Sequence, residues 1–89
     1  MKTTVPNYTP PATVKDYMGR DCKVPRPPRG TIAAAQIVAG YPVELIRVNK
    51  REFHCIYGLQ SPGMCRDLEH ATRIHSSNLA HALTLEGHA

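Results

Sequence analysis

Large aromatic side chains are scarce in this sequence. Its 89 residues include no Trp, one Phe and four Tyr. A chain this short has room for only one small hydrophobic core, because surface outweighs buried volume at this size. We therefore expect one small domain, and we expect self-association or a partner to contribute to its stability.

Long apolar runs are also missing. No stretch approaches the roughly 20 apolar residues that a membrane-spanning helix needs, and no apolar segment typical of a signal peptide follows the first residues. The cysteines, Cys22, Cys55 and Cys65, are odd in number and unevenly spaced, which suits a reducing compartment better than a disulfide framework. The sequence therefore predicts a soluble, cytoplasmic protein without a membrane partner.

Motifs of the common enzyme classes are absent. The sequence contains no glycine-rich phosphate loop, no G-x-S-x-G, no H-E-x-x-H and no close carboxylate pair placed for acid–base chemistry. A nucleophile built from Cys55 or Cys65 would need a pocket that so small a core rarely forms. We therefore expect a protein that is not an enzyme and that uses no cofactor.

Five histidines and three cysteines raise the question of a zinc site. Cys65 and His70 would point about 140° apart on a helix, and no two candidates have a C-x2-C or H-x3-H spacing. We predict no metal site, and we expect Cys55 and Cys65 to be small buried residues. His75 lies at the centre of an apolar stripe and is interpreted as a core residue with a hydrogen-bonded ring; an interface contact and a pH-sensitive position are the alternatives.

Positive charge and proline are concentrated in the N-terminal third. Residues 1–29 hold six of the eight prolines, and the whole formal excess of +4 lies within residues 1–30. Proline fixes φ and removes a hydrogen-bond donor, so it favours extended backbone. The sequence therefore predicts an extended, basic, proline-rich arm over residues 1–29, which is dispensable for folding but not for function.

Four cations of this arm recur at every third position: Arg20, Lys23, Arg26 and Arg29. Polyproline II has three residues per turn, so in that conformation all four would lie along one edge. Such an edge would bind phosphates or a row of carboxylates. The alternative is a flexible, solvated tail.

The rest of the chain, residues 30–89, predicts a small α+β domain that contains a short helix, a β-hairpin and a C-terminal amphipathic helix. Thr31 is suited to cap a helix over residues 32–39, and Gly40 is suited to end it. The segment carries a single polar side chain, Gln36, so the helix is expected to be buried.

The hairpin and the second helix have their own signals. Two β-prone runs, residues 43–48 and 51–59, predict a hairpin with its turn at 49–50, in a register that places Arg47 opposite Glu52. Ser61 followed by Pro62 is typical of a helix start, and the apolar spacing beyond it predicts an amphipathic helix over residues 62 to about 85.

In size, basicity and hairpin-plus-helix organisation, the chain resembles the small accessory proteins of bacteriophages and mobile elements, many of which block host defence complexes, including CRISPR effectors. The resemblance rests on the style of the whole chain and on no specific motif. It implies a non-enzymatic inhibitor, acting in the host cytoplasm, that occupies a surface of a host protein or nucleoprotein complex. The alternative is a nucleic-acid-binding accessory module that acts through the basic arm.

Either partner would present an acidic or nucleic-acid-binding surface to the cations of the protein. The candidate partner-binding residues are the four arm cations and three cations of the hairpin: Arg20, Lys23, Arg26, Arg29, Arg47, Lys50 and Arg51. A homodimer is a further expectation, because a second copy would cover both the apolar surface of Ile32, Ile37 and Val38 and an unpaired edge of the hairpin.

Overall fold

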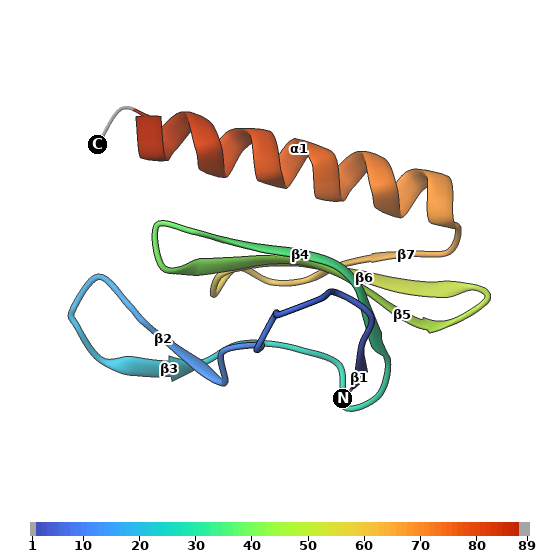
Figure 1. Cartoon of the computed structure of the whole chain (residues 1–89), viewed down its shortest axis with the longest axis horizontal. Coiled ribbons are helices and arrows are strands. Elements are labelled where there is room, and N and C mark those ends of the chain that lie inside the picture. The colour runs from blue at the N-terminus through green and yellow to red at the C-terminus, as the bar shows by residue number, and fades with distance from the viewer. Residues whose placement is uncertain (1, 88–89) are drawn as a thin grey trace.

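The computed structural model describes residues 2–87, so that residue 1 of the predicted arm and residues 88–89 of the predicted domain lie outside it (Figure 1). In chain order its elements are β1 (Lys2–Thr3), β2 (Thr13–Lys15), β3 (Asp21–Lys23), β4 (Thr31–Val38), β5 (Tyr41–Asn49), β6 (Glu52–Tyr57), β7 (Gly63–Cys65) and α1 (Leu68–Gly87).

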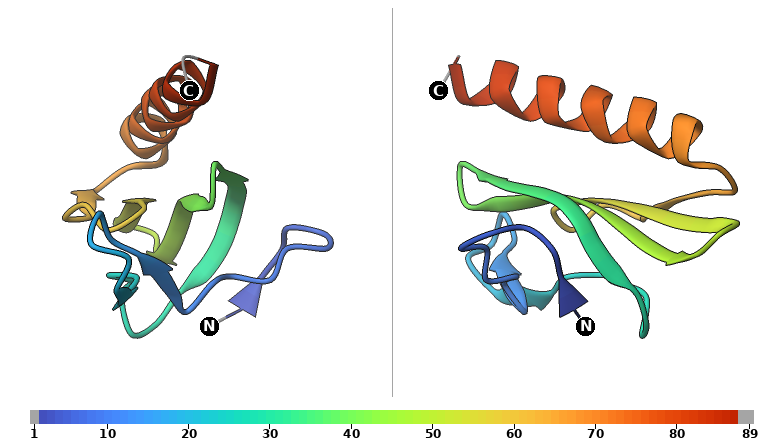
Figure 2. Two further views of the ribbon diagram at one scale, coloured as in Figure 1. Left: turned by 90° about the vertical axis from the view of Figure 1, so that its left-hand side faces the viewer. Right: turned by 45° about the vertical axis from the view of Figure 1, so that its right-hand side comes forward.

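A five-stranded sheet with the order β1-β4-β5-β6-β7 forms the middle of the fold. Strand β1 is parallel to β4, and the other neighbours are antiparallel. Helix α1 covers one face of this sheet, and the N-terminal segment with the β2–β3 hairpin lies against the other face (Figures 1 and 2). The predicted α+β class is confirmed, with apolar side chains buried on both faces of the sheet.

The helix predicted over residues 32–39 is wrong, because this segment forms strand β4. Val38 pairs with Tyr41 across a two-residue turn in which Ala39 and Gly40 both have positive φ, 52° and 85°. Two positive φ values give a turn whose twist matches that of a β-hairpin. Gly40 therefore serves a hairpin turn and not a helix end, and uniform apolarity suits a strand between two layers as well as a buried helix.

The predicted β5–β6 hairpin is present, but its turn and register are shifted by one residue. A register irregularity between Arg47 and Asn49 moves Arg47 opposite Phe53, and Asn49 is opposite Glu52. The turn is formed by the two residues between Asn49 and Glu52. It is held by the Asn49 side chain, whose Oδ1 accepts a hydrogen bond from the Arg51 backbone N–H at 2.8 Å. Asparagine favours turns through this local bond.

The C-terminal helix begins six residues later than predicted. Residues 63–65 form strand β7, which pairs with β6, and α1 starts at Leu68. Asp67 caps the helix, because its Oδ1 accepts a hydrogen bond from the His70 backbone N–H at 2.7 Å. The amphipathic pattern of the helix is confirmed by the burial of Ala71 and Ala82 against the sheet.

The extended arm predicted over residues 1–29 is not what the structure shows. Strand β1 joins the main sheet, where the Thr4 N–H donates to the Ile32 carbonyl oxygen at 3.0 Å. Strands β2 and β3 pair with each other, and Val14 and Val24 are buried. These valines pack with three isoleucines of the main sheet: Ile32, Ile46 and Ile56. The segment is therefore a layer of the fold.

A buried ion pair ties this layer to the sheet. The guanidinium of Arg26 donates from Nε to Glu44 Oε1 and from Nη2 to Glu44 Oε2, both at 2.7 Å, and the Glu44 side chain is 0% exposed. Arg26 Nη1 also donates to the Pro11 carbonyl oxygen at 2.6 Å, and the Tyr8 hydroxyl donates to Glu44 Oε2. Hydrogen bonds to Glu44 raise the pKa of Arg26, and burial together with Glu44 raises the pKa of Tyr8. Both carboxylate oxygens of Glu44 thus accept hydrogen bonds.

His75 lies in the core, as predicted, but without the expected full set of hydrogen bonds. Its side chain is buried, and Nδ1 has no hydrogen-bond partner among the residues that the structure describes. Burial lowers the pKa of His75, partly opposed by the backbone of Glu44. The ring is therefore held neutral in the folded protein at neutral pH.

We expect Arg26→Met to lower the free energy of unfolding by about 3–5 kcal/mol, because it leaves the Glu44 carboxylate buried and unpaired. Urea unfolding measures the loss. The double variant Arg26→Met/Glu44→Gln should recover part of it by removing the orphaned charge. The control is Arg73→Met, which breaks the exposed pair with Glu69 and should cost under about 1 kcal/mol. Equal losses in Arg26→Met and the control would contradict a structural role for the buried pair.

We expect deletion of residues 1–29 to abolish the cooperative thermal transition. The deletion uncovers the apolar face that includes Ile46 and Ile56, and it removes every side chain that bonds to the Glu44 carboxylate. Differential scanning calorimetry or circular dichroism follows the transition. A truncated protein that still unfolds cooperatively would show that the sheet and α1 fold without this layer.

His75 should make stability depend on pH. Its pKa is lowered in the folded state, so below about pH 6.5 the unfolded chain binds a proton that the folded protein resists. The free energy of unfolding should therefore fall as the pH drops through this range, and His75→Leu should remove that part of the fall. The control His70→Gln changes an exposed histidine. Identical pH profiles for wild type and His75→Leu would rule out this contribution.

Candidate partner-binding site

Six cations gather at one end of the five-stranded sheet. Lys2 pairs with Thr31, and Thr31 pairs with Arg47, so these residues form a row across β1, β4 and β5. We call the six the basic end: Lys2, Arg29, Arg47, Lys50, Arg51 and Arg66. All six side chains are exposed.

The strand directions explain why these residues meet. Strands β4 and β6 begin at this end, and β5 and β7 finish there, so residues before or after them in the chain lie together. The backbone at Gly30, next to Arg29, passes close to β5, because a Cβ there would lie 2.7 Å from Ile46 Cγ2 and 3.0 Å from the carbonyl oxygen of Arg47. Helix α1 also starts at this end (Figure 1). Its positive N-terminal dipole has the same sign as the cations.

The charges of the basic end are not neutralised inside the protein. Within residues 2–87, none of the six forms an ion pair. The acidic side chains next to them in the chain have other partners: Glu52 contacts His54 at 2.8 Å, and Asp67 caps α1. In the described part of the chain, the positive charge of the basic end is therefore not balanced by ion pairs.

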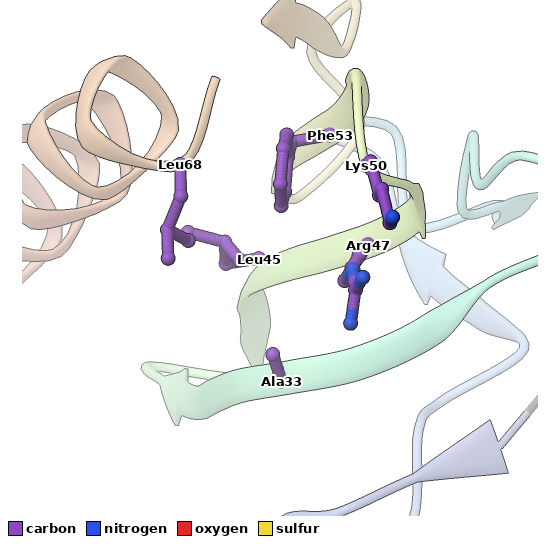
Figure 3. Close-up of a pocket in the computed structure, with 6 residues that line it drawn as sticks. All are labelled: Ala33, Leu45, Arg47, Lys50, Phe53 and Leu68. Atoms are coloured by element: carbon purple, nitrogen blue, oxygen red, sulfur yellow. The ribbon is translucent and has the colours of Figure 1, made fainter. Parts of the chain in front are cut away.

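A groove opens beside Arg47 and Lys50, on the face of the sheet that α1 covers. It has a volume of about 310 Å³, and its other lining residues are apolar: Ala33, Leu45, Phe53 and Leu68. Figure 3 shows Leu45 and Leu68 on one side of the groove, Arg47 and Lys50 on the other, and Phe53 between them. Leu68 is 57% exposed. The groove therefore offers a partner an apolar contact next to two cations.

A second hollow lies on the other side of the β5–β6 turn. It has a volume of about 290 Å³ and is lined by Asn49, Arg51, Glu52, Met64 and Arg66. Met64 is exposed, like Leu68. Both hollows of the basic end thus combine two cations with an exposed apolar side chain.

The structure brings together four of the seven predicted partner-binding residues: Arg29, Arg47, Lys50 and Arg51. The other three belong to the N-terminal layer. Arg20 pairs with Asp16 at 3.1 Å beside the β2–β3 hairpin, and Lys23 ends β3. Arg26 is turned inward to Glu44. The predicted polyproline edge of four cations is therefore not formed, since one of its members is inside the fold.

Sequence reasoning missed Lys2, Arg66 and Leu68 as members of this site. Arg66 falls inside the helix predicted over residues 62 to about 85, whereas the structure places it directly after β7 and before α1 begins. Lys2 reaches the site through the parallel pairing of β1, which is two residues long. A strand of that length has no periodic signal in the sequence.

The buried cysteines carry no sign of chemistry. Cys55 and Cys65 are buried, as predicted, and Cys55 Sγ donates to the Ala71 carbonyl oxygen at 3.3 Å. Burial, together with Cys65, raises the pKa of Cys55 to about 11, so this thiol is protonated and unreactive at neutral pH. In the described part of the chain, no three His, Cys, Asp or Glu side chains are grouped to hold a metal ion.

The helix of the structure is too polar to cross a membrane. Comparison with known proteins gives no matching family model, no similar curated protein and no similar solved structure. The basic end and its groove are therefore the features from which a function is inferred.

Proposed function

We propose that the protein is a non-enzymatic binding module that attaches its basic end to an acidic surface of another protein. The observation that carries this proposal is the groove beside Arg47 and Lys50, where unpaired cations adjoin an exposed leucine. An acidic segment with one protruding apolar side chain matches both features. Its carboxylates would face the cations, and its apolar side chain would enter the groove against Leu68.

The two parts of the site would contribute differently to binding. Exposed cations mainly speed the encounter with an anionic surface and exclude basic partners. The apolar floor supplies affinity, since burying one large apolar side chain is worth about 1.5–3 kcal/mol. Binding through both should therefore be salt-sensitive in its association rate and less so in its dissociation rate.

The surroundings of the cations favour a protein partner over nucleic acid. Modules that bind single strands stack bases on exposed aromatic side chains. At the basic end the aromatic residue is Phe53, which is 4% exposed. Both faces of the sheet are covered, one by α1 and the other by the N-terminal layer. A nucleic acid would contact the cations alone and leave the apolar groove unused.

The resemblance to phage accessory proteins gives this proposal a more specific form. The partner is then a host protein or nucleoprotein complex, and the module inhibits or modulates it by occupying an acidic surface in the host cytoplasm. The cations support the acidic character of that surface. The identity of the complex as a defence system rests on the resemblance alone.

Charge reversal tests the electrostatic part. We expect Arg47→Glu to weaken binding of a synthetic peptide of Asp and Glu with a central Leu about tenfold or more, because one partly desolvated charge contact is worth about 1–3 kcal/mol. The control Arg73→Glu changes a cation on the outer face of α1, already paired with Glu69, and should have a smaller effect. Fluorescence anisotropy over a range of salt concentrations measures both. Equal weakening by the two variants would show that the effect comes from the net charge of the protein and not from a contact at Arg47.

The groove is tested with matched leucines. Leu68→Asn removes the apolar lip of the groove, whereas Leu83→Asn changes a leucine of similar exposure farther along α1. Only the first should weaken binding of the peptide with the central Leu, and neither should change binding of the same peptide with Ser in its place. Single-stranded DNA of equal charge is the competing probe. Tighter binding to the DNA, with a steep salt dependence, would replace the acidic protein by nucleic acid as the partner.

A further inference from the structure

Strand β4 has a free edge along most of its length. Strand β1 pairs with β4 only at Thr31 and Ile32. Among the described residues, no strand lies on that side of residues 33–38, and Figure 2 shows β4 at the border of the sheet. Ile37, on this stretch, is 48% exposed. In the part of the chain that the structure describes, six of the eight residues of β4 therefore lack a neighbouring strand on one side.

The hydrogen bonds around Pro42 show which backbone groups point outward. The Pro42 carbonyl oxygen accepts from the Gly58 N–H at 2.9 Å, so it points toward β6 and away from β4. Ile37 is the partner of Pro42 in β4. In an antiparallel sheet, when two opposite residues are not hydrogen-bonded to each other, the N–H and C=O of each residue point away from the other strand. The N–H and C=O of Ile37 therefore face the free edge, and those of Ala35 do so by alternation.

This edge lacks the features that keep strands apart in solution. Natural edge strands are protected by charged side chains, by proline or by a covering segment. Residues 31–40 contain no charged residue and no proline. The irregularity of β4 lies at its beginning, between Ile32 and Ala34, so the later residues pair regularly with β5. A neutral, regular edge with unpaired backbone groups is suited to accept another strand.

We propose that the β4 edge pairs with the same edge of a second copy of the chain, in an antiparallel arrangement with the two-fold axis at Gln36. Ala35 of each copy then faces Ile37 of the other, and their outward N–H and C=O groups form four hydrogen bonds. The two Gln36 side chains face each other across the axis as a non-bonded pair. The two five-stranded sheets would form one continuous ten-stranded sheet.

The absence of charge on the β4 edge is the reason that we assign a second copy of the chain as the strand that pairs with it. In a two-fold contact, each residue lies opposite the same residue of the other copy or a residue close to it in sequence. Two charged edges would therefore repel each other. The chain has a net charge of +4, yet the β4 edge is neutral. With the axis at Gln36, the two Thr31 residues of the basic rows lie about 33 Å apart along the strands. This distance exceeds the Debye length of about 8 Å at physiological salt, so the basic ends do not oppose pairing.

Sedimentation of the full chain tests the proposal. The wild type should change from 9.8 kDa toward twice that mass as its concentration rises. Gln36→Lys puts like charges opposite each other at the axis, and Ile37→Pro removes an outward N–H while sparing the bonds to β5. Each should raise the dissociation constant about tenfold or more. The control Ala80→Lys adds the same charge on the outer face of α1 and should dimerise like the wild type.

The register is tested by a cross-link. Cβ atoms of a non-bonded antiparallel pair lie about 4.5–5.5 Å apart, so Gln36→Cys should oxidise to a covalent dimer, while Thr72→Cys and the wild type should not. Thermal unfolding confirms that the monomer of each variant is folded, and Gln36→Lys changes an exposed side chain. A wild type that stays monomeric at every concentration would overturn the proposal. So would dimerisation that Gln36→Lys leaves unchanged.

Discussion

The fold depends on the buried ion pair between Arg26 and Glu44. A carboxylate without exposed surface in a central strand is costly, because it has lost its hydration. Among residues 2–87, the side chains that bond to the Glu44 carboxylate and offset this cost are Arg26 and Tyr8, which both lie in the N-terminal layer. We therefore expect that layer to be folded whenever the sheet is folded. Once it is in place, it also covers the isoleucines on its side of the sheet.

The same ion pair removes Arg26 from the positive charge on the surface. Composition alone places a formal excess of +4 in the first 30 residues, a count that already subtracts Asp16 and Asp21, and the pairing of Arg26 with Glu44 takes one more cation out of it. Arg26 is committed to Glu44, Arg20 to Asp16 and Lys15 to Asp21. The cations without such partners lie largely at the basic end. A charge count along the chain therefore indicates the N-terminal third, whereas the unpaired cations on the surface of the folded protein lie mostly at the basic end.

Local patterns predicted those parts of the structure whose partners are near in sequence. The β5–β6 hairpin, the amphipathic character of α1 and the burial of Cys55 and Cys65 follow from alternation, helical spacing and residue type. The β4 segment is locally suited to a helix, because alanine and glutamine favour helices, and its pairing with β5 overrides that preference. Local propensity is weak enough for such tertiary contacts to override it.

The N-terminal layer could not be predicted, because its contacts join residues far apart in the chain. Glu44 lies 18 residues from Arg26 and 36 from Tyr8, and no local pattern relates them. The prolines predict an extended arm. They do restrict φ, but an extended backbone packs against a sheet as readily as it projects into solvent. Arg66 and Lys2 could not be assigned to the basic end for the same reason, because their positions there depend on the pairing of β7 and β1 with the rest of the sheet.

The two interaction surfaces inferred for this protein are separate in position and in chemistry. The basic end is cationic and lies where β4 and α1 begin, whereas the β4 edge is neutral and runs along the side of the sheet. Antiparallel pairing of two copies would point their basic ends in opposite directions and leave both free. A partner with two acidic sites at a matching distance would then bind both ends at once, and the second contact would form at a high effective concentration. A small domain with a single groove would in this way gain affinity by self-association without enlarging its core.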